Sequence, residues 1–100
     1  MKYKLFEHKK AKKFLKKHAK DEKLLLRINK KYLEILKNPY ESEFIELTSN
    51  KCPKCQRARV GNYRIIFYVS ESKKQIEIID IISRKIKYRL FWNFSKQMRL

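Results

Sequence analysis

The sequence predicts an α+β fold in which a two-helix hairpin packs on a small, mainly antiparallel sheet. Between residues 8 and 38, apolar side chains recur at helical spacing. Between residues 40 and 82, β-branched and aromatic runs are separated by short polar turns, which is typical of strands. Two helices on one face of such a sheet form an α+β layer arrangement. The predicted element order is β-α-α-β-β-β-α.

The N-terminal half predicts a strand followed by two helices. Residues 2–7 predict a short strand, because Tyr3 and Leu5 alternate with Lys2 and Lys4. From His8 the pattern is helical, with lysines on the face opposite Ala11, Phe14, Leu15 and His18. Asp21 and Glu22 suit the first turn of a second helix, because the helix dipole favours acids there. That helix ends at Asn38, because a residue before proline avoids the α region.

The C-terminal half predicts sheet strands and a final helix. Strands are expected at 44–47, 57–60, 63–69 and 75–82, with a short helix in 86–98. The only glycine, in Gly61-Asn62, marks a hairpin turn or a bulge. The pairs Ile78-Ile79 and Ile81-Ile82 predict a last strand that is buried on both faces or carries a bulge.

The length and composition indicate one small, folded, strongly cationic domain, residues 1–100. The 100 residues include 27 Lys plus Arg against 10 Asp plus Glu, which gives a net charge of +17. The 43% hydrophobic content is enough for a packed core, so a disordered basic tail is excluded. A large multi-domain enzyme is excluded by length.

The charge predicts a polyanionic partner, with nucleic acid or the ribosome foremost. An acidic protein partner is compatible with it. The alternative is a solvated surface, since twenty of the 27 cations are lysines. No apolar run is long enough for a signal peptide or a membrane span, the longest being Ile65–Val69. We therefore expect a cytoplasmic protein with no membrane partner.

The densest group of candidate site residues lies around the glycine turn. On a strand Arg57 and Arg59 share one face, and a tight turn returns Arg64 beside them. Arg84 follows the next strand, and Tyr88 lies one helical turn further on. Four guanidinium groups and a phenol can together bind a phosphate and stabilise the charge that develops during phosphoryl transfer. The alternative is that the arginines simply face water from a half-exposed strand.

Lysines flank this group, and a cysteine pair lies beside it. The candidate RNA-binding lysines are Lys51, Lys54, Lys85 and Lys87. The spacing of Cys52 and Cys55 is that of a zinc-knuckle half-site, but zinc needs four ligands and no second such pair exists. The two histidines, His8 and His18, are distant in the sequence. Reduced thiols, a disulfide that closes a small loop, and a metal half-site therefore all remain open, and no cofactor is expected.

Residues 2–91 resemble the RelE/ParE toxin superfamily of toxin–antitoxin systems. The matching segments are the helix end Leu36-Lys37-Asn38-Pro39, the stretch Arg57–Tyr68 around the glycine turn, and Ile81–Tyr88. The resemblance implies a compact α+β fold and a cognate antitoxin. In the RelE branch it implies a metal-independent endonuclease that cuts mRNA on the ribosome. In that reaction the ribose 2′-hydroxyl attacks the adjacent phosphate and leaves a cyclic phosphate and a 5′-hydroxyl.

The resemblance also assigns roles to residues. It places Arg57 and Arg59 at a basic pair that is often lysine in the RelE branch, and it matches Arg64, Arg84 and Tyr88 to the other site positions. Arginine stays protonated to about pH 12, so it is a poor general base and a good phosphate clamp. The general base would then be Lys51, Lys54, Tyr88 or a group of ribosomal RNA. Position 83, often histidine in relatives, is serine here.

Two other functions remain open at this point. One is a ParE-like toxin that inhibits DNA gyrase and has no nuclease activity. The other is a non-catalytic basic protein that binds RNA. Blocked replication with intact mRNA would indicate the former, and salt-dependent RNA binding without cleavage would indicate the latter.

Overall fold

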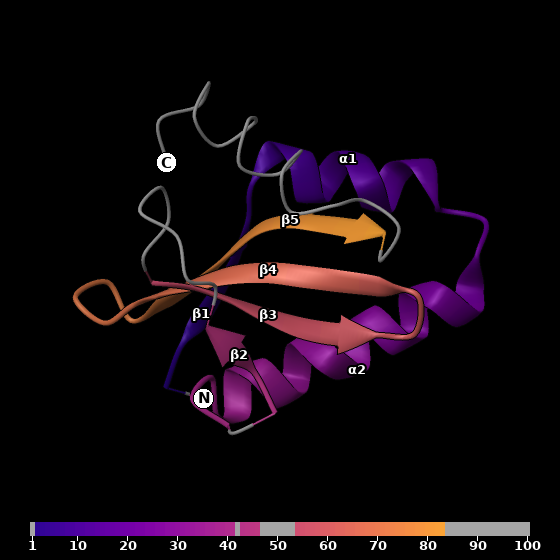
Figure 1. The fold of residues 1–100 in the computed structure, drawn as a ribbon. Coiled ribbons are helices and arrows are strands. Elements are labelled where there is room, and N and C mark those ends of the chain that lie inside the picture. The colour runs from indigo at the N-terminus through magenta and orange to yellow at the C-terminus, as the bar shows by residue number, and fades with distance from the viewer. Residues whose placement is uncertain (1, 42, 47–53, 84–100) are drawn as a thin grey trace.

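The computed structural model describes residues 2–41, 43–46 and 54–83. Their elements follow the predicted order β-α-α-β-β-β (Figure 1). The helices and strands are β1 (Lys4–Glu7), α1 (Lys9–Lys17), α2 (Glu22–Lys37), β2 (Ile45–Glu46), β3 (Cys55–Val60), β4 (Tyr63–Ser70) and β5 (Gln75–Ser83). The helix expected in 86–98 lies outside the described residues.

The sequence signals at the ends of α2 act as predicted. The side chain of Asp21 accepts a hydrogen bond from the Leu24 amide at 3.2 Å and so caps the first turn. The helix ends at Lys37, and Asn38 before the proline has extended backbone angles. The start of α1 is different, because its N-cap residue His8 makes no side-chain capping bond.

The sheet has five strands in the order β1-β5-β4-β3-β2. The β5–β4, β4–β3 and β3–β2 pairs are antiparallel, and β1 joins β5 in parallel, with Lys4 opposite Gln75. The prediction of a mainly antiparallel sheet is confirmed. Both helices cover one face of the sheet, and α2 crosses behind β3 in Figure 1. The phenol of Tyr32 on α2 donates a hydrogen bond to Glu7 Oε2 at 2.8 Å and ties the helix to β1.

The sheet buries apolar side chains on both faces. The main core, between helices and sheet, includes Ile28 and Ile35 of α2 and Ile65 and Phe67 of β4. A second cluster occupies the opposite face and consists of Cys55, Ile66, Ile79 and Ile82, with Tyr68 packed against it. The isoleucine pairs of β5 are therefore split between the two faces, as predicted.

Neighbouring residues of a strand face opposite sides, and a bulge in β5 changes which of its residues face the helices. Ile66 is opposite Asp80, whereas the next residue, Phe67, is opposite Ile78. Ile79 is the extra residue, so the alternation of β5 switches there and Ile78 before the bulge and Ile81 after it both face the main core. The sequence predicted that the last strand is buried on both faces or carries a bulge, and β5 has both features.

Candidate phosphate-binding site

Three arginines lie on the sheet face opposite the helices. Arg57 and Arg59 alternate along β3 with Ala58 and Val60, which belong to the main core. On β4, Arg64 precedes the core residue Ile65 and lies directly opposite Arg59. Because alternate residues of a strand share a face, the three guanidinium side chains project from the same face of two adjacent strands. The structure thus confirms that Arg57, Arg59 and Arg64 lie together.

The electrostatics of this group favour an anion. Side chains directly opposite each other on antiparallel strands have Cβ atoms about 4.5–5.5 Å apart, and like charges at that separation destabilise the sheet. Arg59 is exposed, and Arg64 is half-buried. A phosphate held by both guanidinium groups would offset their repulsion through charge-assisted hydrogen bonds. The arrangement is chemically suited to clamping a phosphate.

The turn at Gly61 keeps the two strands in this register. Gly61 has a φ of +55°, a conformation that other residues adopt at a cost. It is the first of two turn residues, the position where hairpin turns of type II′ require glycine. Arg27 of α2 lies against this turn, since a Cβ added to Gly61 would be 3.3 Å from its Nη1.

The end of the hairpin is held against α1 by an aromatic cluster. The Tyr63 ring meets Phe14 edge-on, with centroids 5.2 Å apart, and meets His18 in the same way at 5.7 Å. Phe14 and His18 stack on each other at 4.1 Å, and His18 Nδ1 lies 2.9 Å from the Phe14 carbonyl oxygen. The cluster fixes the residue that precedes Arg64. Sequence reasoning gave Tyr63 no separate role, although His18 falls on the apolar stripe of α1 with Phe14.

The last strand ends beside the arginine hairpin. Tyr63 is opposite Ser83, the final residue of β5, and Arg64 is opposite Ile82. Five other predicted site residues lie outside the described part of the chain, namely Lys51, Arg84, Lys85, Lys87 and Tyr88.

Lys54 is described, and the structure places it away from the arginine pair. It is exposed and precedes β3, five residues before Arg59. At about 3.3 Å per strand residue, the two Cα atoms are separated by about 16 Å. Lys54 instead lines a cavity of about 570 Å³ together with Tyr40, Gln56 and Tyr68. Lys54 therefore lies towards the opposite end of β3 from the Arg59–Arg64 pair.

Cys55 is disulfide-bonded and fully buried. Of the three states left open by the sequence, the structure has the disulfide. A disulfide sulfur is not a thiolate ligand, so this state offers Cys55 to no metal. Within residues 2–41, 43–46 and 54–83, no group of three or more His, Cys, Asp or Glu residues could hold a metal ion. Cys52 lies outside those ranges.

Both histidines contact side chains other than Cys55. His8 Nε2 is 2.8 Å from Glu77 Oε1, and His18 belongs to the aromatic cluster. Neither helix of the described chain has the length and apolar composition needed to cross a bilayer.

A half-buried acid on β5 was not singled out by sequence reasoning. Burial raises the pKa of the Asp80 carboxyl, although the Ile81 amide and the charge of Lys10 act in the opposite direction. The Ile81 amide donates to Asp80 Oδ1 at 2.8 Å. Asp80 is opposite Ile66, which is itself opposite Arg57, so two strand spacings of about 10 Å in total separate Asp80 from Arg57. The sequence feature that could have identified Asp80 is its position as an acidic residue inside a run of isoleucines.

Comparisons with known proteins agree with this fold. Residues 6–88 match the model of the ParE toxin of type II toxin–antitoxin system, parDE. No curated protein sequence gives a significant match. A solved structure of a double mutant of the E. coli toxin RelE in the free state is similar over the full length of both chains, with 20% identity and a TM-score of 0.73.

Two further structures are similar. The archaeal RelE–RelB complex from Pyrococcus horikoshii OT3 has 26% identity and a TM-score of 0.68, over 87% of this chain and all of that one. The YoeB/ParE toxin from Agrobacterium tumefaciens has 17% identity and a TM-score of 0.72, over 80% of this chain and 96% of that one. The family match covers most of the chain, and the folds agree. The chain belongs to the ParE toxin family of type II toxin–antitoxin systems, within the RelE/ParE toxin superfamily.

Proposed function

We propose that this toxin is a metal-independent endoribonuclease that cuts mRNA on the ribosome and is restrained by a cognate antitoxin. The observation that carries the proposal is the cross-strand pair Arg59–Arg64, with Arg57 on the same sheet face. Three guanidinium groups on one face suit the binding of an RNA phosphate. We expect residues 1–100 to act as one domain in the cytoplasm, where ribosomes and mRNA occur.

The proposed reaction is an internal transfer at one phosphate. The ribose 2′-oxygen attacks the adjacent phosphorus, the bond to the 5′-oxygen breaks, and the 2′-proton passes to a base. The leaving 5′-oxygen takes up a proton, so the products are a 2′,3′-cyclic phosphate and a 5′-hydroxyl. Arg57, Arg59 and Arg64 would stabilise the negative charge that builds on the phosphoryl oxygens. They would not serve as the base, because arginine remains protonated.

The remaining site residues keep the roles that the superfamily resemblance gives them. We propose that Arg84 and Tyr88, which follow β5 in the chain, complete the phosphate site. Lys51, Tyr88 or a ribosomal group would act as base. Lys54, about 16 Å from Arg59 along β3, is assigned to binding the RNA backbone, as are Lys85 and Lys87.

An antitoxin partner is supported by charge and by the similar structures. A net charge of +17 favours an acidic partner segment, whose binding would neutralise part of the surface. Solved complexes with similar toxin chains include the archaeal RelE–RelB complex and the RelBE2 toxin–antitoxin complex of Mycobacterium tuberculosis. The P. horikoshii complex, at 26% identity, also supports assignment to the RelE branch.

The test is controlled expression of the wild type, Arg64→Ala, Arg64→Lys and the exposed-turn control Lys73→Ala, with mapping of cellular mRNA 5′ ends. Cuts in translated frames are expected for the wild type and Lys73→Ala. They should be lost in Arg64→Ala and strongly reduced in Arg64→Lys, which keeps the charge but loses the bidentate geometry. Growth arrest with intact mRNA and blocked replication would reject the proposal in favour of gyrase inhibition. RNA binding without any cut would indicate a non-catalytic binder.

A further inference from the structure

A cavity of about 570 Å³ lies at the end of the sheet where β4 and β5 are joined. This volume is within the range of sites that bind small organic molecules. The lining residues include Tyr40, which follows α2, Lys54 and Gln56 around the start of β3, and Val69 and Glu71 around the end of β4. We call the space lined by these five residues the distal cavity.

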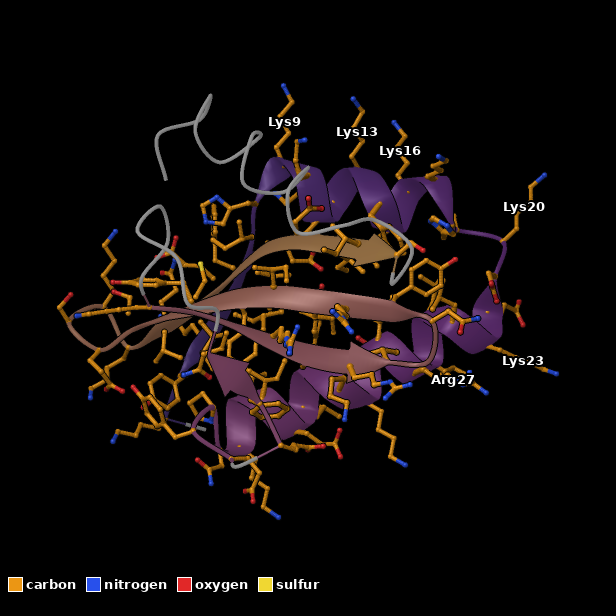
Figure 2. The ribbon with its side chains drawn as sticks, in the orientation of Figure 1. Lys9, Lys13, Lys16, Lys20, Lys23 and Arg27 are labelled. Atoms are coloured by element: carbon orange, nitrogen blue, oxygen red, sulfur yellow. The ribbon has the colours of Figure 1, made fainter. Side chains whose placement is uncertain are left out.

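The distal cavity is remote from the arginine hairpin and from the cations where the two helices meet. Figure 2 shows Lys20, Lys23 and Arg27 at the end of the molecule that carries the β3–β4 turn, and Figure 1 shows the β4–β5 turn at the other end. Lys54 is about 16 Å from Arg59 along β3. A ligand of the distal cavity would therefore lie apart from the candidate phosphate-binding site.

Gln56 has a buried oxygen that lacks a hydrogen-bond donor. Along β3 it continues the row of Ala58 and Val60, which face the main core, so an apolar residue would be expected there. Among the described residues, Gln56 Oε1 is buried without a hydrogen-bond partner. A buried acceptor left without a donor destabilises a fold, and buried polar groups are nearly always paired. The Gln56 amide therefore suits a ligand that brings an N–H group into the cavity.

Tyr40 supplies an aromatic wall that is held in place. The residue is 56% exposed, and its phenol donates a hydrogen bond to Glu71 Oε2. Glu71 is held in turn by the phenol of Tyr3 at 2.7 Å and by Lys74 Nζ at 2.9 Å. The ring contacts found between aromatic side chains of the described residues do not involve Tyr40. An exposed ring in a fixed position offers a stacking surface to a flat heterocycle.

Lys54 gives the distal cavity a positive charge for an anionic group. It is exposed and takes part in none of the ion pairs between described residues. Glu71 does not offset this charge, because its carboxylate is already paired with Lys74. A ligand that suits the cavity therefore combines a flat ring, an N–H donor and an anionic group. A nucleotide has all three features.

The chemistry of the Gln56 amide favours adenine among the bases. The amide presents an acceptor beside a donor, and adenine offers the matching donor and acceptor as N6 with N7, or as N6 with N1. Guanine O6 and N7 are both acceptors, so that edge would leave the Gln56 oxygen unpaired. We propose that the distal cavity binds an adenine nucleotide, either free or as one residue of an RNA chain.

In this site the adenine N6 group donates to Gln56 Oε1, the base stacks on Tyr40, and Lys54 binds the phosphate. No bond is made or broken. The proposal does not rest on the proposed nuclease function, because binding of the nucleotide requires no cleavage.

The first test is calorimetric titration of the full chain with AMP, GMP and ribose 5-phosphate at an ionic strength of about 0.15 M. We expect AMP to bind with a Kd below about 1 mM and GMP to bind at least about fivefold more weakly. Ribose 5-phosphate, which has no base, should show no saturable binding. It therefore controls for attraction of phosphate to the general positive charge of the chain.

Two pairs of variants separate recognition from folding. Gln56→Leu removes the amide, and Gln75→Leu makes the same change at a half-buried residue of β5 that is not among those lining the cavity. Affinity for AMP should fall about fivefold or more in Gln56→Leu and stay near the wild-type value in Gln75→Leu. Gln56→Leu should unfold at a urea concentration no lower than the wild type, because it removes an unpaired acceptor. Tyr40→Phe keeps the ring and should bind AMP more tightly than Tyr40→Leu.

A 2′-O-methylated RNA of sequence UUAUU, which lacks the 2′-nucleophile and cannot be cut, distinguishes the two sources of the nucleotide. Tighter binding of UUAUU than of UUUUU, with the difference lost in Gln56→Leu, would assign the cavity to a residue of RNA. AMP binding without that difference would assign it to a free nucleotide.

Three results would overturn the proposal. They are the absence of both AMP binding and a preference for UUAUU, equal affinities for AMP and GMP, and unchanged affinities in Gln56→Leu. Uncut mRNA with the wild type, together with AMP binding that is lost in Gln56→Leu, would instead reject the nuclease proposal and leave this one standing.

Discussion

Arg59 on β3 lies directly opposite Arg64 on β4, so two side chains that always carry positive charge share one cross-strand pair. Repulsion in such a pair lowers the stability of the hairpin, whereas opposite charges there would raise it. The turn glycine and the Tyr63 contacts with α1 nevertheless hold the register. The two positive charges of this pair therefore favour binding of a phosphate but lower the stability of the unbound hairpin.

Replacing Arg59 with Gln should make the unbound protein more stable. The change removes a like-charge pair at an exposed position and should raise the free energy of unfolding by a few tenths to about 1 kcal/mol. Urea unfolding at low salt measures this gain, which should shrink at high salt because ions screen the pair. Lys73→Gln makes the same change in net charge in the β4–β5 turn. Equal gains in the two variants would show that net charge, and not the cross-strand pair, is responsible.

Replacing Gly61 with Ala should destabilise the hairpin. The positive φ of Gly61 costs an L-residue about 1–2 kcal/mol. The new Cβ would also meet Arg27 Nη1 at 3.3 Å, but that contact is the end of a flexible side chain and can move. Thermal unfolding of Gly61→Ala and of Asn62→Ala, a change at the neighbouring turn position without positive φ, gives the comparison. Unfolding temperatures that fall equally would contradict the role given to the glycine conformation.

Asp80→Asn should stabilise the protein at neutral pH. Burial is the largest influence on the Asp80 carboxyl and raises its pKa, so the charged form is disfavoured in the folded state. The folded protein binds this proton more tightly than the unfolded chain, and the destabilising contribution declines as pH falls through the folded pKa. Asparagine keeps an oxygen for the Ile81 amide without the charge. The urea concentration at the midpoint of unfolding should be higher for Asp80→Asn than for the wild type at pH 7, and this difference should disappear near pH 3. A difference of the same size at both pH values would refute the explanation.

Glu71 should contribute to the acid sensitivity of the fold. Its carboxylate accepts hydrogen bonds from the phenols of Tyr40 and Tyr3 and from Lys74 Nζ, and these bonds lower its pKa to about 2. A lowered folded pKa stabilises the protein above the unfolded pKa of about 4.5, and this contribution is lost as pH falls towards 2.

Unfolding between pH 5 and pH 2 measures this contribution. Glu71→Gln should reduce the dependence of stability on pH in that range, because the group that takes up the proton is gone. Glu41→Gln removes a carboxylate that accepts a hydrogen bond from Asn38 alone among the described contacts, and it should keep more of the wild-type dependence. Identical pH curves for Glu71→Gln and the wild type would exclude Glu71 as a contributor.

Local signals in the sequence accounted for most of the described fold. Asp21 and Asn38 marked the ends of α2 because capping and the effect of proline depend on neighbouring residues only. The alternation of side chains along the strands on either side of Gly61 predicted that the arginines share one face, and this pattern too depends only on neighbouring residues. The parallel pairing of β1 with β5 could not be predicted in this way, since it joins Lys4 to Gln75 across most of the described chain.

The site was predicted less completely than the fold. The contact of Tyr63 with Phe14 and His18 depends on how the helices dock, which periodicity does not specify. Lys54 precedes β3, and the extended strand separates it from Arg59 because each strand residue advances the chain by about 3.3 Å. The state of Cys55 was open because the spacing of two cysteines does not by itself decide between a thiol pair, a bridge and a metal half-site.

The most direct measurement of the central claim is the chemistry of the RNA ends. Purified wild type and Arg64→Ala would be incubated with translating ribosomes and a defined mRNA, and the fragments analysed by mass spectrometry. The account predicts 2′,3′-cyclic phosphate and 5′-hydroxyl ends with the wild type and full-length mRNA with Arg64→Ala, although both proteins unfold at similar urea concentrations. Equal cleavage by a folded Arg64→Ala variant, or uncut mRNA with the wild type, would contradict it.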